Sequence, residues 1–249
     1  IIDSLSRTGS EANLKWLVDS DNRNSLSFEK GDIRDKEFIS KVFSENKDVD
    51  YVCHAAGQVA MTKSLENPRY DLETNVIGTF NVLEAVREFC SYALVAYSST
   101  NKVYGDLKNL EYIEHEKRYS VLGYPQGFDE ELSLDFSTPY GCSKGAADQY
   151  MHDWSRVYGI NTVVLRHSSI YGGRQYATYD QGWVGWFCSE IMRQREEFLK
   201  TRSCVPFTIS GNGKQVRDVL HSNDLVSLYR QLYEKRHVSA GEVYNIGGG

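Results

Sequence analysis

The chain of 249 residues is long enough to bury a substantial core, and its 41% hydrophobic and 25% charged residues are typical of a globular protein. A formal net charge of −6 provides no basic stripe, so nucleic acid is not an expected partner. The sequence has no apolar run of about 18 residues and no leader-like opening, which predicts a soluble, cytoplasmic protein without a membrane partner. The five cysteines are scattered and odd in number, so we expect small buried side chains and no metal site.

The first ten residues, IIDSLSRTGS, resemble the end of a second strand. A doubly wound dinucleotide fold normally begins with a strand and a G-x-G-x-x-G loop, and neither is found here. The sequence therefore predicts a fold that lacks its first strand and glycine loop. YNIGGG at 244–249 is likewise expected to form a strand and a turn rather than a finished terminus.

Strand-like runs then alternate with helical stretches along the chain. Strands are expected in 49–57, 92–100 and 160–172, and helices over 75–89 and 141–158. This alternation predicts βαβ units and a doubly wound parallel sheet, an α/β fold of the Rossmann type. Polar residues collect where the strands end, and ligands of open parallel sheets bind outside those carboxyl ends.

Two segments lack this alternation. Residues 106–138 are rich in Tyr, Glu and Lys, and are expected to form a surface excursion that serves as a lid or binding loop. Residues 174–216 mix aromatic, Gly and polar residues and suit a smaller substrate-binding lobe. We therefore predict a dinucleotide-binding domain over 1–172 and a mainly substrate-binding lobe over 173–249, part of which returns to the sheet.

The strongest local motif is YGCSK, from Tyr140 to Lys144. Residues four apart on a helix share one face, so the ammonium can lie beside the phenol and is expected to lower its pKa. A phenol tuned in this way can take a proton from an alcohol during hydride transfer. The Y-x-x-x-K pattern is common, however, and by itself more often describes an exposed helix pair. The SST at 98–100 can supply a hydroxyl to the same alcohol, although it can also be a strand-terminal turn.

Five segments in this order resemble the extended short-chain dehydrogenase/reductase family of nucleotide-sugar epimerases and dehydratases. They are HAAGQVA, NVIGTFNVLEA, YSSTNKVYG, TPYGCSKGAADQYM and LRHSSIYGGRQ. The resemblance implies NAD as cofactor, Tyr140 as acid/base, Lys144 as its partner and ribose anchor, and Thr100 as the assisting hydroxyl. The cofactor-binding residues that it implies are Asp3, Ser4, Asp32, Ile33, Ala55, Ala56, Gly57, Asn75, Ser98, Tyr140, Lys144 and His167.

Some of these residues have ordinary alternatives. Asp3 falls where the family places the carboxylate that binds the adenosine ribose, and a carboxylate there favours NAD over NADP. Asp32 and Ile33 would lie beside the adenine, or simply form a strand-to-helix turn. His167 can line the pocket or be a hydrogen-bonded structural residue.

The type of reaction follows from the two residues after Thr100. The family's dehydratases carry an Asp-Glu pair there, because elimination needs an acid to protonate the leaving hydroxyl. Asn101 and Lys102 replace that pair in this sequence, which favours epimerisation, a reaction that needs neither carboxylate. Another nucleotide-sugar epimerase, such as a 4-epimerase, and an inactive cofactor-binding fragment remain alternatives.

Further segments, including AGQVAMTKS and PFTISGNGKQVRDVLH, resemble epimerases that act at C2 of a CDP-linked hexose. The substrate-binding residues that this resemblance implies are Gln58, Thr62, Thr100, Ser169, Arg174, Gln181 and Arg217. A guanidinium suits the diphosphate, but Arg217 can instead pair with Asp218. Trp183 and Trp186 can line the nucleotide pocket or pack in a core. Kinship also implies a homo-oligomer through the stretches 76–90 and 141–158.

Overall fold

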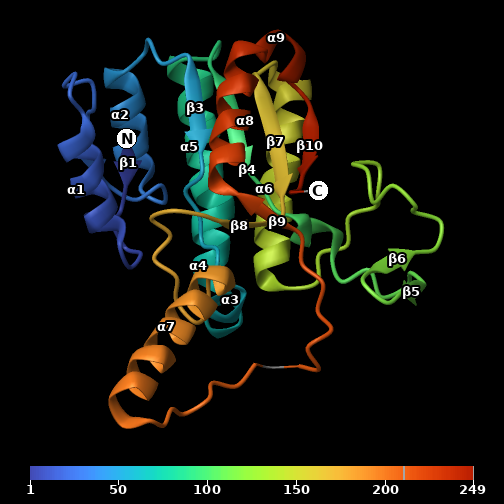
Figure 1. Cartoon of the computed structure of the whole chain (residues 1–249). Helices are drawn as coiled ribbons and strands as arrows, with labels where there is room; N and C mark the ends of the chain where they lie inside the picture. The colour runs from blue at the N-terminus through green and yellow to red at the C-terminus, as the bar shows by residue number, and fades with distance from the viewer. Residues whose placement is uncertain (210, 249) are drawn as a thin grey trace.

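The computed structural model describes residues 1–209 and 211–248, so Ser210 and Gly249 of the predicted second lobe lie outside it. Its main sheet has four parallel strands in the order β10-β7-β4-β3. The bounds of these strands are Tyr51–His54 for β3, Leu94–Ser98 for β4, Thr162–His167 for β7 and Val243–Ile246 for β10. All four strands lie where the sequence predicts them, and the doubly wound α/β fold is confirmed (Figure 1).

The helices cover both faces of this sheet, because its central strand is apolar on both sides. In β4, Val95 and Tyr97 pack in one cluster, while Leu94 and Ala96 pack in another. Helices α2 (Lys36–Glu45), α5 (Gly78–Phe89) and α6 (Pro139–Tyr158) cover the first face. Helix α8 (Ser222–Glu234) covers the second face (Figure 1). The predicted helices over 75–89 and 141–158 therefore exist, with α6 beginning two residues earlier at Pro139.

A second, two-stranded sheet lies beside the main one. Strand β1 (Ile2–Asp3) pairs in parallel with β2 (Glu29–Lys30), and helix α1 (Ser10–Ser20) connects them. A cavity of about 680 Å³, lined by β1 and β3 residues among others, separates the two sheets. No strand of residues 1–209 or 211–248 fills this gap. The arrangement agrees with the predicted lack of a first strand and glycine loop.

Short elements lead from β3 and β4 into the site. The chain passes through α3 (Met61–Glu66), α4 (Pro68–Asp71) and the π-helix η1 (Leu72–Ile77) before α5. After β4 comes the short 3-10 helix η2 (Asn101–Tyr104). The Asn67 side chain caps α4, and Pro68 occupies its first turn. These elements place several polar side chains near the carboxyl end of β4.

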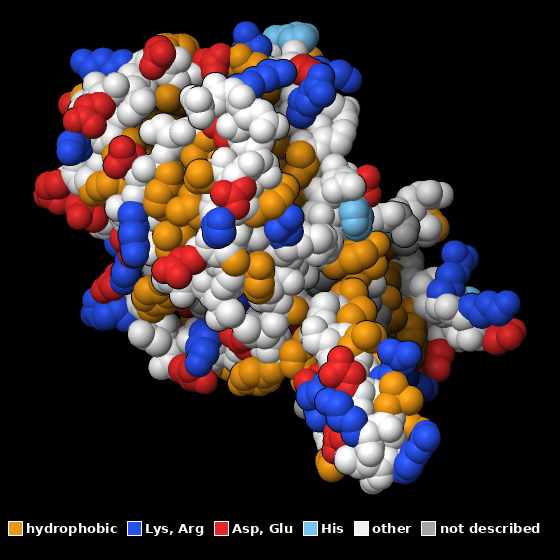
Figure 2. Space-filling view, turned by 60° about the vertical axis from the view of Figure 1, so that its left-hand side comes forward, with side chains coloured by type: hydrophobic (Ala, Val, Ile, Leu, Met, Phe, Trp, Pro, Cys, Tyr) orange, Lys and Arg blue, Asp and Glu red, His pale blue; other side chains and the backbone are white. Residues whose placement is uncertain are grey.

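The two segments without clear periodicity form projections from the body. The predicted excursion contains the antiparallel hairpin of β5 (Tyr112–Glu114) and β6 (Tyr119–Val121). In the second segment a long helix, α7 (Trp183–Thr201), stands away from the body and carries Lys, Arg and Glu toward its far end (Figures 1 and 2). Strands β8 (Ser169–Tyr171) and β9 (Val219–His221) pair in parallel, and α9 (Arg236–Ser239) precedes β10.

The exposure of the cysteines and the apolar character of the helices bear on two further predictions. Only Cys90 is buried, while Cys53, Cys142, Cys188 and Cys204 are exposed, so the expectation of buried cysteines is wrong for four of them. Cys53, for example, lines the open cavity beside β3. Among the described residues, no helix combines the length and the apolar character needed to cross a bilayer.

Candidate active site

The predicted catalytic residues meet at the carboxyl end of β4. Thr100 follows the strand and caps η2, with its hydroxyl accepting a hydrogen bond from the Lys102 amide at 3.2 Å. Tyr140 lies in the first turn of α6, which Thr138 caps by accepting from the Gly141 amide at 3.0 Å. The Thr100 side chain lies near enough to the Tyr140 phenol to lower the pKa of that phenol. A hydroxyl and a phenol from residues 40 apart in sequence are thus brought together at one site.

The pKa of Tyr140 differs from the expectation drawn from the motif. Burial raises the pKa of the phenol, the bond from Thr100 lowers it, and the Asp71 charge raises it. The net direction is upward, so the prediction that Lys144 lowers the phenol pKa is wrong for this structure. The reason is geometric, because the Lys144 ammonium donates to the Ser98 carbonyl and lies 4.2 Å from the centroid of the Tyr97 ring.

Lys144 is the most strongly perturbed cation of the site. Its side chain lies in the second turn of α6 and is buried, which lowers the pKa of its ammonium to about 7. The carboxylate of Asp148, one helical turn further on, opposes this shift. The hydrogen bond to Ser98 uses one of the three ammonium protons, which leaves donors for a ribose.

The predicted pocket residues Ser98 and His167 are hydrogen-bonded to each other. The distance from Ser98 Oγ to His167 Nε2 is 2.7 Å. Burial, aided by the Lys144 charge, lowers the pKa of His167 to about 4, so the imidazole is neutral at neutral pH. Both residues thus border the Lys144 ammonium, Ser98 through its backbone carbonyl and His167 through its ring.

Asn75 and Gln58 form a buried amide pair behind the site. Asn75 Oδ1 accepts from the Gln58 amide at 2.8 Å, and Asn75 Nδ2 donates to Ser143 Oγ at 2.9 Å. The Gln58 side chain donates to Asp71 Oδ1 at 2.7 Å and to the Ala60 carbonyl at 2.9 Å. The side-chain amide of Gln58 is therefore hydrogen-bonded within the protein, although the sequence predicts that Gln58 borders the sugar.

The small residues after β3 allow a close approach to the backbone. Ala55 and Ala56 are exposed and line the cavity between the two sheets. A Cβ on Gly57 would lie 2.9 Å from Asn75 Oδ1 and 3.8 Å from Lys144 Nζ. Glycine is needed here because any larger side chain would press on the amide that accepts from Gln58.

The residues predicted to bind adenosine lie at the same edge of the structure. Asp3 is exposed at the end of β1 and accepts from the Leu5 amide at 2.6 Å, while Ser4 bonds Ser6. Asp32 receives the Arg34 guanidinium, with Nη2 2.7 Å from Oδ2, and this pair lowers the pKa of Asp32. Ile33 is buried in the core.

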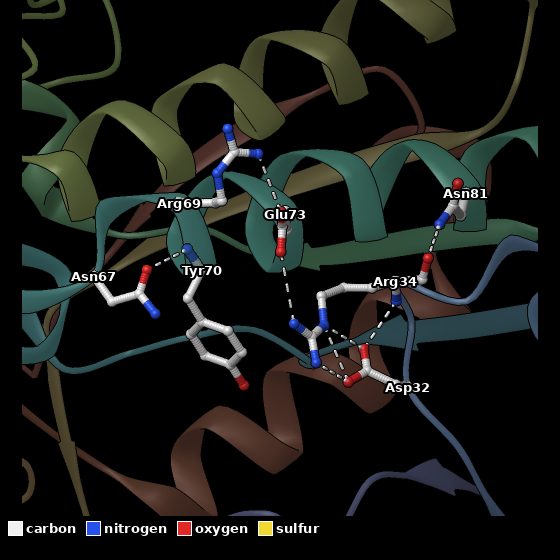
Figure 3. Close-up of polar contacts among 7 residues, drawn as sticks. All are labelled: Asp32, Arg34, Asn67, Arg69, Tyr70, Glu73 and Asn81. Atoms are coloured by element: carbon white, nitrogen blue, oxygen red, sulfur yellow. Dashed lines mark hydrogen bonds and ion pairs between the residues drawn. The ribbon is translucent and has the colours of Figure 1, made fainter.

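Arg34 is held on several sides, which sequence reasoning missed. Figure 3 shows its guanidinium between Asp32 and Glu73, with the Tyr70 ring on one side. Arg34 Nη1 lies 3.8 Å from Glu73 Oε2, and the guanidinium carbon lies 4.8 Å from the Tyr70 ring centroid. The Asn81 amide donates to the Ile33 carbonyl at 2.9 Å, which fixes the loop backbone. The GDIRD spacing was the available signal, since an Asp two residues before an Arg can pair locally.

The predicted substrate residues are not gathered in one contact network. Thr62 is exposed on α3, Ser169 lies on β8, and Gln181 forms a backbone bridge with Thr178. The Arg174 guanidinium carbon lies 3.8 Å from the centroid of the Trp16 ring. Their predicted contacts with a sugar nucleotide stay predictions.

Arg217 and the two tryptophans also stay open as binding residues. The Arg217 guanidinium is exposed and donates to the Val216 carbonyl at 2.7 Å. Asp218 accepts from Ser168 at 3.3 Å and from the Gly248 amide at 2.8 Å, so its contacts differ from the ion pair considered as an alternative. Trp183 is exposed on α7, while Trp186 is half-buried and its ring lies 5.4 Å from that of Phe187 and 5.3 Å from that of Phe207, so both alternatives stay open for the pair.

Comparison with known proteins agrees with this geometry. Residues 2–247 match the NAD dependent epimerase/dehydratase family. The chain is 53% identical over 248 residues to the CDP-paratose 2-epimerase of Salmonella typhi, covering all of this chain and 71% of that protein. It is 30% identical to a putative UDP-glucose 4-epimerase of Methanocaldococcus jannaschii, covering all of this chain and 72% of that protein. The UDP-glucose 4-epimerase of Thermus thermophilus in complex with NAD is 25% identical, with a TM-score of 0.75 over 100% of this chain and 69% of that one.

Proposed function

This chain belongs to the NAD dependent epimerase/dehydratase family, and from that premise we propose that it epimerises C2 of a CDP-linked hexose, converting CDP-paratose to CDP-tyvelose. The observation that carries the proposal is the convergence of Thr100, Tyr140 and Lys144 at the carboxyl end of β4, in a chain 53% identical to a CDP-paratose 2-epimerase. Asn101 and Lys102 support it, because neither side chain can act as the carboxylic acid that elimination requires. The reaction is that of an isomerase and proceeds through a transient keto sugar.

The residues present fit NAD. Asp3 keeps an exposed carboxylate for a ribose, Ala55 and Ala56 leave the backbone open, and Lys144 retains ammonium donors. When bound, NAD would supply a hydride acceptor for oxidation of the sugar carbon and a hydride donor for the reduction that inverts it. We assign Asp3, Ser4, Asp32 and Ile33 to the adenosine end and Asn75, Ser98, Lys144 and His167 to the nicotinamide end.

The chain's own residues move the proton. As the alcohol is oxidised, the Tyr140 oxygen takes the proton from the sugar hydroxyl, and the same phenol returns it as the ketone is reduced. The Thr100 hydroxyl, which lowers the pKa of the phenol and so favours the phenolate, orients the sugar oxygen. With NAD bound, the Lys144 ammonium would be positioned to bind the ribose and to stabilise the phenolate through its charge.

The substrate contacts and the division of labour are further parts of the proposal. The segment 1–172 would bind the cofactor and the segment 173–249 mainly the sugar nucleotide. Arg217 is exposed and suits the diphosphate, and Trp183 presents an exposed ring that suits a base. We assign to the sugar nucleotide Gln58, Thr62, Thr100, Ser169, Arg174, Gln181 and Arg217. We also place the protein in the cytoplasm, on the same resemblance.

Incubation of the purified chain with CDP-paratose and NAD is expected to produce CDP-tyvelose. The measurement is the proton NMR spectrum of the sugar, in which inversion at C2 changes the coupling between the C1 and C2 protons. A spectrum unchanged despite added NAD would contradict the enzyme assignment and favour the cofactor-binding fragment. Turnover of UDP-glucose to UDP-galactose, with CDP-paratose left intact, would favour the 4-epimerase instead.

We propose in addition that two copies pair through the outer faces of α5 and α6. Tyr150 and Val157 are exposed there, and the Trp154 ring lies 5.0 Å from that of exposed Tyr158. Tyr158→Glu would place a charge in this contact and is expected to weaken the dimer at least about tenfold, as interface aromatics commonly contribute that much. Sedimentation velocity measures the effect, and Val226→Glu on α8 is the matched control. A wild-type chain that is monomeric at micromolar concentration would contradict the pairing.

A further inference from the structure

Asp148 is a fully buried carboxylate that the proposed reaction does not use. It lies one helical turn after Lys144 and two after Tyr140 on α6. Asp148 Oδ2 accepts from Ser99 Oγ at 2.7 Å and from Arg166 Nε at 3.0 Å, and Oδ1 accepts from Arg166 Nη2 at 2.9 Å. Both members of this ion pair are at most 5% exposed. A buried pair of this kind is weak evidence for stability, so another role has to be considered.

The pair continues into a chain of hydrogen bonds across the sheet. Arg166 Nη1 donates to the Tyr104 hydroxyl at 2.9 Å, and that hydroxyl donates to Asn245 Oδ1 at 2.7 Å. Asn245 Nδ2 in turn donates to the Phe128 carbonyl at 3.1 Å. The network therefore joins α6, β7, η2, β10 and the excursion after β4.

The hydrogen bond from Ser99 to Asp148 connects this network to the turn beside the proposed catalytic residues. Ser99 lies between Ser98, whose carbonyl accepts from Lys144, and Thr100, whose side chain lowers the pKa of the Tyr140 phenol. Asp148 belongs to the helix that carries Lys144 and Tyr140. One carboxylate thus joins the helix and the turn that must stay in register for the site to form.

Besides accepting this hydrogen bond, Asp148 carries a negative charge that acts on the Lys144 ammonium. The groups that face the Lys144 ammonium from the neighbouring elements are His54 of β3, Tyr97 of β4 and His167 of β7. Both histidines are neutral, because burial holds their pKa values at about 3 and about 4. Asp148 is the one charged side chain among the groups that shift the pKa of Lys144 in the described residues, and it raises that pKa.

We propose that Asp148, held by Arg166, is a positioning residue for the reaction: it fixes the 98–100 turn against α6 and keeps the Lys144 ammonium charged. The inference rests on the proposed function for its kinetic consequences. Its structural consequences concern Lys144 in the chain without substrate and can be measured whether or not turnover occurs.

The first test is a set of variants with pH profiles. Asp148→Asn, and the double variant D148N/R166Q, which removes both buried charges together, are expected to move the alkaline limb of turnover to lower pH by about one unit. The sign follows because loss of the carboxylate lowers the pKa of Lys144, so the ammonium is lost at lower pH. Tyr104→Phe is the matched control, since it removes the hydroxyl between Arg166 and Asn245 and no charge, and its limb is expected to stay in the wild-type position.

Ser99→Ala separates position from charge. It removes one hydroxyl and no charge, so turnover is expected to fall about tenfold with the limb unmoved, as misplacement of a reacting group has costs of that order. This variant keeps the proposal testable if neither charge variant folds. Wild-type turnover of Ser99→Ala, or a folded D148N/R166Q with a wild-type limb, would overturn the proposal.

The second test needs no substrate. The NMR titration of ¹³C-labelled lysine in the chain reports the Lys144 pKa directly, and it is expected to fall by about one unit in D148N/R166Q and to stay unchanged in Tyr104→Phe. An unchanged value in the double variant would contradict the inference even in an active enzyme. A lowered value in a chain that turns over no CDP-paratose would leave the inference standing and remove only the proposed function.

Discussion

Tyr140→Phe is expected to lower turnover by at least about 10²-fold, because general acid–base catalysis typically contributes 10²–10⁴-fold. The substitution removes the phenol oxygen near Thr100 and leaves the ring in its place in the first turn of α6. The Tyr140 amide still donates to Ser64 Oγ, at 3.2 Å in the parent chain, so the helix start is preserved. The measurement is the initial rate of CDP-paratose conversion, with the circular dichroism spectrum as the check on folding.

Tyr150→Phe is the matched control for this loss. Tyr150 lies on the same helix, is 41% exposed and has its ring 5.6 Å from that of Phe80. Its change is expected to leave the rate within about twofold, as for most exposed substitutions. A Tyr140→Phe enzyme that retains activity within about tenfold of the parent would contradict the acid/base role.

Lys144→Met is expected to abolish turnover and to make the chain more stable at neutral pH. Burial lowers the pKa of Lys144 from its ordinary 10.5 to about 7. Between those two values the unfolded chain binds a proton that the folded chain does not, so the parent chain gains stability as the pH rises from about 7 toward 10.5. Below about pH 7 this gain in stability is absent, because Lys144 is protonated in both the folded and the unfolded chain.

The methionine variant removes this dependence. Methionine has a similar length and no charge to bury, so the free energy of unfolding at pH 7 is expected to rise by at least about 1 kcal/mol, since one pKa unit corresponds to about 1.4 kcal/mol. Urea unfolding at about pH 7 and pH 9.5 measures the effect, and the gap between variant and parent should narrow at the higher pH. Lys41→Met on the exposed face of α2 is the control. A variant less stable than the parent at pH 7 would contradict the burial cost.

The parallel sheet could be predicted because its strands are local apolar runs. The stretches around Val95 and Val164 are buried on both faces, and such strands read as continuous hydrophobic segments. Thr100, Tyr140 and Lys144 could be found because their motifs are short and lie at the ends of predicted elements. These are properties that a single sequence displays.

The rest depended on contacts between distant residues. Arg166 and Asp148 are 18 residues apart and pair only because β7 lies beside α6, and Tyr104 meets Asn245 across 141 residues. The phenol pKa was predicted with the wrong sign because the direction of the Lys144 ammonium depends on where the Ser98 carbonyl lies. Helix α7 was missed because the segment mixes Gly and aromatic residues and no residue of the helix is buried.

The fate of the hydrogen at C2 of the sugar tests the central claim most directly. CDP-paratose deuterated at C2 is incubated in ordinary water with the chain and NAD, and the CDP-tyvelose formed is examined by NMR. The proposed reaction passes only the hydroxyl proton through Tyr140 and returns the same hydride to carbon, so the product is predicted to keep its deuterium. CDP-tyvelose that has exchanged deuterium for solvent hydrogen at C2 would contradict the account.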